Sequence, residues 1–235
     1  MAYNYYYSGG GRGGFLSSLP PVTKNLIIIN VIFFFATLLN GNLTTLLALY
    51  YPTSPKFHVW QIVTHMFMHG GFWHIFFNMY TLLIVGSVVE RIIGSRKFLV
   101  FYFVCGLGAV ALHLGVEYLQ IQSYIAGAAL GNGVAIQRIA EIKGIPTVGA
   151  SGAIYGVLIG YAMLFPDSRM TLLFPPVTLS AKWMVIVFAG IELLTGVTGI
   201  ASGIAHFAHL GGMLIGWLMI LWWRRRGILF EPDKI

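Results

Sequence analysis

Six apolar stretches, each close to the length that crosses a bilayer, constrain this chain more than any other feature. Hydrophobic residues make up 57% of the sequence and charged residues 9%, and the mean hydropathy is +0.80, which is rare for a water-soluble domain. A transmembrane helix needs about 20 apolar residues. The stretches cover residues 22–39, 72–89, 98–118, 150–165, 183–197 and 204–223. The sequence therefore predicts an all-α membrane protein with six transmembrane helices within residues 22–223.

The basic residues predict how this bundle is oriented. With both termini in the cytosol, all Lys and Arg residues except Lys56, Arg138 and Lys143 fall on the inner side. Short cytoplasmic loops carry such an excess of positive charge. We therefore expect an N-in, C-in topology, with residues 1–21 as a flexible cytosolic tail and 224–235 as a basic cytosolic tail. Membrane orientation accounts for the net charge of +7, so no nucleic-acid partner is implied.

A serine and a histidine occur at the same expected depth on two of these stretches. Ser151 lies fifteen residues before Pro166 in the fourth stretch, and His209 lies fifteen residues before Arg224 in the sixth. At 1.5 Å per residue, both lie about 22 Å from the inner boundary, which is several ångströms below the outer surface of a hydrocarbon core of about 30 Å. A serine nucleophile needs an adjacent base. The two residues therefore predict a catalytic pair within the membrane.

Small residues accompany this pair. Gly212 and Gly216 follow His209 on its own helical face, and Gly152 and Gly156 form a small-xxx-small pair beside Ser151. Such spacing alone favours simple helix packing. Together with a serine and a histidine at matched depth, it favours catalysis, because their hydrogen bond requires a close approach of the two helices.

Three further side chains are expected near this site. His74 and Asn78 bracket the same depth on the second stretch and lie one helical turn apart, so they can direct two hydrogen-bond donors at one point. Without the serine motif, an interhelical hydrogen-bonded pair would explain them equally well. Tyr155 lies one turn below Ser151 and is expected to pack on the His209 ring, although the sequence also allows an ordinary core aromatic.

These motifs together resemble the rhomboid family of intramembrane serine proteases. The resemblance rests on Gly149-Ala150-Ser151-Gly152 with Tyr155 for the family's GxSG helix, on Ala208-His209 with Gly212 and Gly216 for AHxxGxxxG, and on His74 to Asn78 for HxxxN. It implies a six-helix rhomboid-like bundle with Ser151 as the nucleophile and His209 as general base and then acid. It also implies an oxyanion site formed by the Ser151 backbone N–H, His74 and Asn78.

The remaining polar residues receive secondary roles. His206 lies one turn from His209 but lacks glycines three and seven positions later, so it is interpreted as a solvated group at the site edge. His65 and His69 are interpreted as scaffold residues that could shape the entry to the site. Glu192 is expected about 7 Å deeper than Ser151, which favours a structural role over gating and argues against a third catalytic member.

Two alternatives to a protease stay open at this point. One is a catalytically inactive rhomboid-like binder of membrane proteins, which the presence of both Ser151 and His209 argues against. The other is a metal or proton transporter using the five histidines His65, His69, His74, His206 and His209, although the sequence contains no HExxH motif. The protease interpretation requires no cofactor or metal. It implies transmembrane protein substrates in the lipid bilayer, and the sequence best fits a multi-pass protein of a bacterial plasma membrane.

Overall fold

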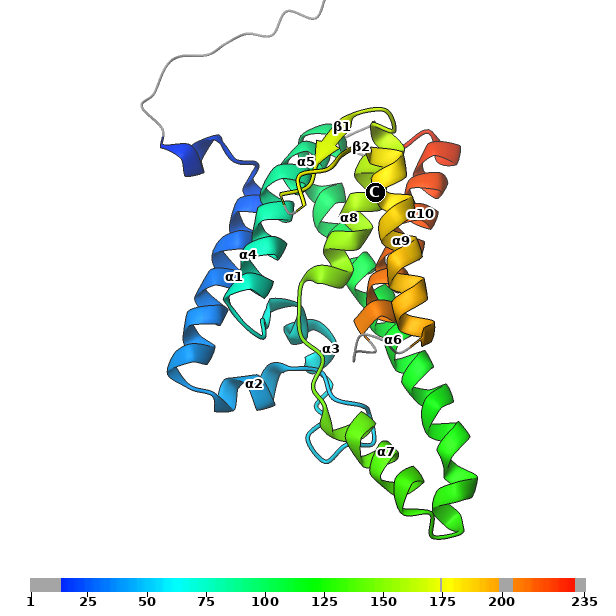
Figure 1. Cartoon of the computed structure of the whole chain (residues 1–235). Coiled ribbons are helices and arrows are strands. Elements are labelled where there is room, and N and C mark those ends of the chain that lie inside the picture. The colour runs from blue at the N-terminus through cyan, green and yellow to red at the C-terminus, as the bar shows by residue number, and fades with distance from the viewer. Residues whose placement is uncertain (1–13, 174, 199–204, 231–235) are drawn as a thin grey trace, which may run out of the picture.

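The computed structural model describes residues 14–173, 175–198 and 205–230 and is a helical bundle with one projecting helical hairpin (Figure 1). One long apolar helix, Phe72–Ile93, consists of α4 (Phe72–Thr81), a π-helical segment (Leu82–Gly86) and α5 (Ser87–Ile93). The other bundle helices are α1 (Pro21–Leu39), α6 (Ser95–Ala129), α8 (Ser151–Leu164), α9 (Ala181–Thr198) and α10 (Ala205–Arg226).

Five of these helices are long and apolar enough to cross a membrane: α1, Phe72–Ile93, α6, α9 and α10. The chain is therefore an integral multi-pass membrane protein. The sixth apolar helix, α8, has only 14 residues, or about 21 Å of helix. The predicted count of six spans thus depends on how this short helix lies in the bilayer.

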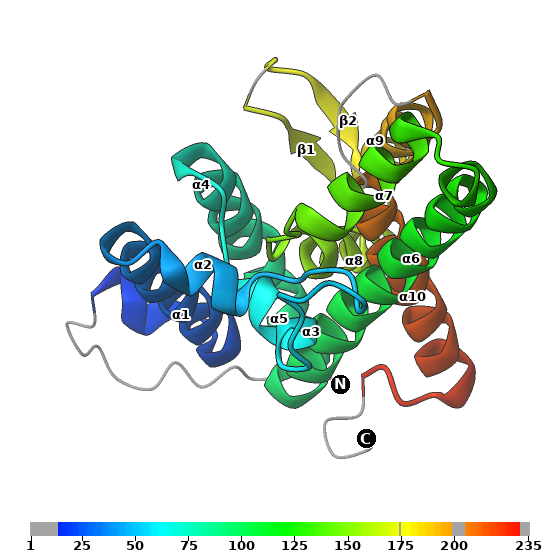
Figure 2. The ribbon, with the colours of Figure 1, turned by 90° about the horizontal axis from the view of Figure 1, so that it is seen from below.

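The short helix α8 lies in the middle of the bundle, where it contacts α6, α9, α10 and the Phe72–Ile93 helix (Figure 2). Gly152, Ala153, Gly156, Gly160 and Ala162 are among its buried residues, and these small side chains allow the neighbouring helices to pack closely. The irregular segment before α8 is hydrogen-bonded to the outer part of the chain at Thr147 and Gly149. Leu49 and Thr147 exchange two N–H···O bonds of 2.8 and 2.9 Å, and the Gly149 N–H donates to the His65 carbonyl. Protein contacts thus replace water for this backbone.

The outer segment before α4 contains α2 (Asn42–Leu47), α3 (Gln61–Thr64) and a 3-10 turn at His65–Phe67. The fully buried Gln61 holds this segment together, because its amide nitrogen contacts the backbone carbonyls of Thr45, Leu46 and Lys56. Thr64 donates to the Leu47 carbonyl at 2.7 Å. The segment is therefore a hydrogen-bonded platform beside the N-terminal end of α8.

Several predicted boundaries were wrong. The third helix was expected to end near residue 118, but α6 continues to Ala129 and is followed by α7 (Gly133–Gly144), whose N-terminus is capped by Asn132. The sixth helix continues through Arg226, because nothing in the three consecutive arginines breaks a helix. Residues 1–13 and 231–235 of the two predicted tails, and residue 204, lie outside the described residues.

The fold also contains a short strand pair that an all-α prediction misses. β1 (Arg169–Thr171) pairs antiparallel with β2 (Thr178–Ser180) in the connection from α8 to α9. The Thr171 and Thr178 hydroxyls lie opposite each other at 2.8 Å, a common cross-strand contact. Three-residue strands are too short for hydrophobic periodicity to reveal them.

Candidate active site

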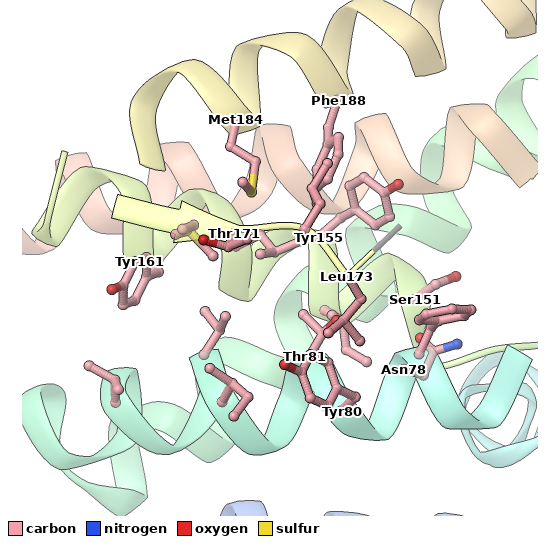
Figure 3. A pocket seen from close by; sticks show the side chains of 18 of the residues that line it. Asn78, Tyr80, Thr81, Ser151, Tyr155, Tyr161, Thr171, Leu173, Met184 and Phe188 are labelled. Carbon is pink, nitrogen blue, oxygen red and sulfur yellow. The ribbon is translucent and has the colours of Figure 1, made fainter. Parts of the chain in front are cut away.

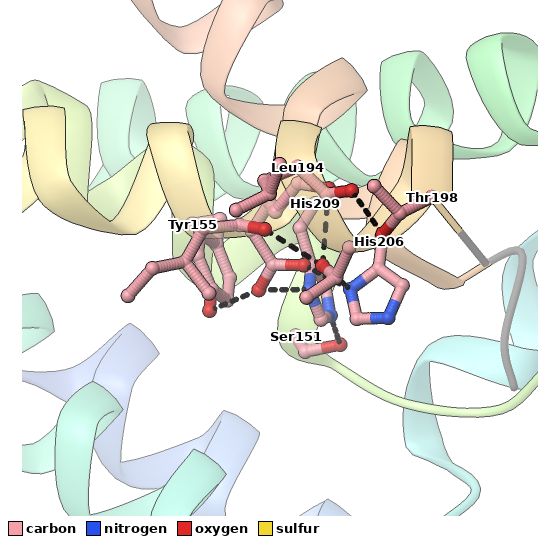
Figure 4. Close-up of polar contacts among 9 residues, drawn as sticks. Ser151, Tyr155, Leu194, Thr198, His206 and His209 are labelled. Atoms are coloured by element: carbon pink, nitrogen blue, oxygen red, sulfur yellow. Dashed lines mark hydrogen bonds and ion pairs between the residues drawn. The ribbon is translucent and has the colours of Figure 1, made fainter. Parts of the chain in front are cut away.

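Ser151 and His209 lie in hydrogen-bond contact. The Ser151 Oγ atom is 2.8 Å from His209 Nε2 (Figure 4). Ser151 is the first residue of α8, so its backbone N–H is one of the N-terminal groups that have no partner within their own helix, and the positive end of the helix dipole lies there. His209 lies in the second turn of α10. Two groups that are 58 residues apart in sequence thus meet at the buried end of a central helix.

Glycines let α8 and α10 approach closely enough for this contact. A Cβ atom on Gly212 would overlap the Gly152 carbonyl oxygen, and one on Gly216 would lie 2.7 Å from the Gly156 carbonyl oxygen. Real Cβ atoms do not approach backbone oxygens this closely. The absence of side chains at these positions is therefore a condition for the distance between Ser151 and His209.

This packing predicts a strong effect of one added methyl group. We expect Gly212→Ala to push α10 away from α8, to lower the melting temperature in detergent and to reduce any Ser151-dependent activity by roughly a hundredfold, since a misplacement of about 1 Å can have that effect. Gly190→Ala on α9 is the matched control, because its Cβ would meet nothing within 4 Å. Equal activity and stability of the two variants would contradict this account of the helix crossing.

Tyr155 packs flat on His209. The two ring centroids are 4.3 Å apart and the planes differ by 7°. The Tyr155 hydroxyl extends past the imidazole and donates to Glu192 Oε1 at 2.6 Å. The ring contact agrees with the expectation from the sequence, and it limits the rotation of His209 about its side-chain bonds.

The predicted separation of Glu192 from the serine site was wrong. Glu192 Oε1 lies 2.9 Å from His209 Nδ1, and Oε2 lies 2.5 Å from His206 Nδ1. A depth measured along the backbone neglects the reach of the Glu and His side chains, each several ångströms long. One sequence signal could have placed Glu192 near the site. Glu192 lies ten residues from the inner boundary and Tyr155 lies eleven, so the two side chains are expected at the same depth.

His206 also differs from the interpretation as a solvated edge residue. Its side chain is 19% exposed, and its Nδ1 atom contacts both Glu192 and the Thr195 hydroxyl. His206, His209 and Tyr155 thus surround one carboxylate (Figure 4).

His74 lies beside Ser151, with Gly149 between them. A Cβ atom on Gly149 would be 2.9 Å from His74 Nε2 and 3.3 Å from Ser151 Oγ, and the φ angle of +130° at this position also favours glycine. The Gly70 N–H donates to His74 Nδ1 at 3.3 Å. Because Nδ1 is then the acceptor, the neutral ring carries its proton on Nε2, on the side toward Gly149.

Asn78 lies next to Ser151, and both side chains line a cavity within the bundle (Figure 3). One of its amide N–H groups donates to the His74 carbonyl at 2.8 Å, and an amide has a second N–H to offer. His74 and Asn78 therefore both present donors on the Phe72–Ile93 helix, facing the N-terminal end of α8.

His65 and His69 belong to the outer segment, where His65 contacts Gly149 and His69 contacts His74. Burial lowers the pKa of each to about 4, so both imidazoles are neutral at pH 7. His65 Nδ1 contacts the Gln61 carbonyl at 2.9 Å, and the His65 carbonyl accepts the Gly149 N–H. The His69 ring packs edge-on against His74 with centroids 5.0 Å apart. These contacts agree with scaffold roles.

A cavity of about 670 Å³ extends from Ser151 along the bundle (Figure 3). One wall is the Phe72–Ile93 helix, and the other is formed by α8, α9 and strand β1. The lining is mostly apolar and aromatic and includes Trp73, Phe77, Tyr80, Met184 and Phe188. Its size and character suit an extended peptide or an apolar side chain rather than an ion.

The five histidines of the transporter alternative do not converge on one point. His206 and His209 contact Glu192, whereas His65 contacts Gln61. Over residues 14–173, 175–198 and 205–230, no three His, Cys, Asp or Glu side chains are arranged to hold a metal ion.

Comparison with known proteins gives consistent relatives. A Rhomboid domain model matches residues 56–226, well over half of the chain. Rhomboid protease AarA of Providencia stuartii is 27% identical over 185 residues, which cover 76% of this chain and 60% of AarA. Rhomboid protease GlpG of Yersinia pestis (strain Pestoides F) is 29% identical over 188 residues, which cover 79% of this chain and 56% of GlpG.

The chain thus spans less than two thirds of the length of these relatives. The matched segment nevertheless includes the outer segment from Lys56 onward, α4 to α10, and every site residue described above. On the extent of the domain match, this chain belongs to the rhomboid family.

Proposed function

We propose that this protein is a serine-type intramembrane endopeptidase that cleaves transmembrane proteins near the outer membrane–water boundary. The observation that carries the proposal is the 2.8 Å contact between Ser151 and His209 at the start of a short central helix. The names of the relatives, rhomboid proteases AarA and GlpG, support the same reaction.

In the proposed mechanism, Ser151 Oγ attacks the scissile carbonyl while His209 Nε2 takes the serine proton. His209 then returns this proton to the leaving amine, which yields an acyl-enzyme and a released fragment. Water deprotonated by His209 hydrolyses the ester and restores Ser151.

The oxyanion of each tetrahedral intermediate would be held by three donors. They are the Ser151 backbone N–H, the Nε2–H of His74 and the free N–H of the Asn78 amide. Donors fixed before the reaction stabilise charge that develops only in the transition state. The hydrogen bonds of Gly70 to His74 and of Asn78 to the His74 carbonyl keep both side chains oriented.

The substrate would enter along the 670 Å³ cavity between the Phe72–Ile93 helix and α9. A transmembrane helix has its backbone groups paired internally, so the segment to be cleaved must unwind before Ser151 can reach it. Small or helix-breaking residues near the outer end of the substrate would favour that unwinding.

For the membrane arrangement, we propose six spans with both termini inside. The clustered basic residues Arg91, Arg169, Lys182 and Arg224 to Arg226 support the orientation, because all lie on the side where α5 and α10 end. With α8 as the short fourth span, Ser151 lies below the outer surface. The bacterial relatives support a bacterial inner membrane as the location.

One reconstitution distinguishes the protease from both alternatives. The purified chain is mixed in detergent with a single-span reporter protein, with or without EDTA, and the fragments are mapped by mass spectrometry. We expect one cut near the outer end of the reporter span, unchanged by EDTA, since the dyad uses no metal. Loss of cleavage in EDTA with recovery on adding zinc would support a metal site instead. An intact reporter under all conditions would support the inactive binder.

A further inference from the structure

Glu192 is a buried acid that has no part in the dyad mechanism described above. It lies in the apolar helix α9 and is 7% exposed. A carboxylate within a spanning helix is costly unless its oxygens accept hydrogen bonds, and this one has three partners. Oε1 lies 2.6 Å from the Tyr155 hydroxyl and 2.9 Å from His209 Nδ1, and Oε2 lies 2.5 Å from His206 Nδ1.

The contact with His209 determines which ring nitrogen carries the proton. A carboxylate at Nδ1 accepts a hydrogen bond, so the Nδ1 atom must be the N–H of the neutral ring. The lone pair is then on Nε2, which faces Ser151 Oγ at 2.8 Å. Without an acceptor at Nδ1, the ring would also populate the opposite tautomer, which cannot take the serine proton.

The other partners hold the carboxylate in place. Tyr155 comes from α8, and both histidines come from α10, so Glu192 on α9 joins three helices at one group. The Thr195 hydroxyl contacts His206 Nδ1 at 3.1 Å and fixes the outer histidine in turn. The carboxylate therefore has little freedom to turn away from His209.

We propose that Glu192 is a residue that positions His209 toward Ser151, and that His206 and Tyr155 hold its carboxylate in place by hydrogen bonds. The proposal rests on the proposed protease function. When Ser151 attacks, its proton moves to His209 Nε2 while the Nδ1 proton stays on the ring. Glu192 remains ionised and stabilises the imidazolium that forms, as an acid does in a Ser-His-Asp triad.

Charged and titratable groups around His209 come from three elements. They are Glu192 on α9, Tyr155 on α8 and His206 on α10 itself. Glu192 supplies the negative charge among these three. A loss of kcat when Glu192 becomes an amide therefore reports the loss of this carboxylate.

The test compares Glu192→Gln with wild type on the single-span reporter at several reporter concentrations. We expect kcat to fall about a hundredfold or more with little change in KM, by comparison with roughly a ten-thousandfold loss when the acid of a serine protease triad becomes an amide. A purely structural role of Glu192 would lower the melting temperature and raise KM together with the loss of kcat.

Two further variants keep the result interpretable. Glu192→Asp retains the charge but shortens the side chain, so we expect at least tenfold slower labelling by a fluorophosphonate probe. Glu141→Gln is the control for an acid-to-amide change, because Glu141 lies on α7 in an exposed ion pair with Arg138. If Glu192→Gln does not fold, Glu192→Asp decides the point. Labelling of Glu192→Asp at the wild-type rate would then overturn the proposal.

Failure of this inference and failure of the protease function give different results. Equal kcat for folded Glu192→Gln and wild type, with Ser151→Ala inactive, would overturn the role of Glu192 alone. Wild type that neither cleaves the reporter nor reacts with the probe would overturn the protease function as well.

Discussion

Ser151→Ala and His209→Ala are each expected to reduce cleavage of a single-span reporter to the background rate. The alanine at 151 has no nucleophile, and the alanine at 209 leaves the serine hydroxyl without a base at 2.8 Å. Because the two groups act as one unit, the double variant should be no slower than either single variant. Rates measured in the same detergent, with protein folding checked by melting temperature, decide the point.

Two variants provide the controls for this experiment. Ser87→Ala removes another buried serine from an apolar helix, at a position that contributes nothing to the 670 Å³ cavity, so it should cleave normally. His206→Ala removes a clamp on Glu192 but not the base, so we expect only a several-fold loss. An inactive His206→Ala beside an active His209→Ala would contradict the assignment of the base.

The combined variant His74→Ala with Asn78→Ala is expected to lower kcat by at least a hundredfold while KM changes little. Both side chains would stabilise only the oxyanion, and loss of one such donor elsewhere lowers the rate by about 10² to 10³. Each single variant should be milder, because the remaining side chain and the Ser151 N–H still hold part of the charge. Steady-state rates at several reporter concentrations separate kcat from KM.

A matched pair outside the site controls for the loss of these residue types. His58 stacks on Trp60 in the outer segment and Asn42 is exposed on α2, so the double alanine variant at these positions should retain wild-type kcat. A folded His74 and Asn78 double variant with unchanged kcat would contradict the oxyanion site.

The long apolar helices and the meeting of Ser151 with His209 could be predicted from the sequence for a clear physical reason. A bilayer forces long apolar helices, and the serine and histidine occur at equal distances from polar boundaries on two of them. The glycine spacing then indicates which faces meet. The contacts of Gly212 with Gly152 and of Gly216 with Gly156 lie on the faces that this spacing selects.

Side-chain reach and local geometry could not be predicted in the same way. The number of residues along the helices predicts Glu192 about 7 Å from the level of Ser151, yet the reach of the two long side chains brings its Oε1 atom to 2.9 Å from His209 Nδ1. The extension of α6 to Ala129 was missed, because polar residues after residue 118 end the apolar pattern without ending the helix. The tautomer of His74 depends on one N–H of Gly70, a contact without any periodic signature.

The most direct measurement of the central claim is the reaction of the folded protein with a fluorophosphonate, with the modified residue identified by mass spectrometry. We expect a single adduct on Ser151, formed in wild type and Ser87→Ala and absent from Ser151→Ala, His209→Ala and heat-denatured protein. This pattern requires a serine activated by its neighbour within an intact fold. An unmodified Ser151 in folded wild-type protein, or labelling that persists in His209→Ala at the wild-type rate, would contradict the Ser151–His209 dyad.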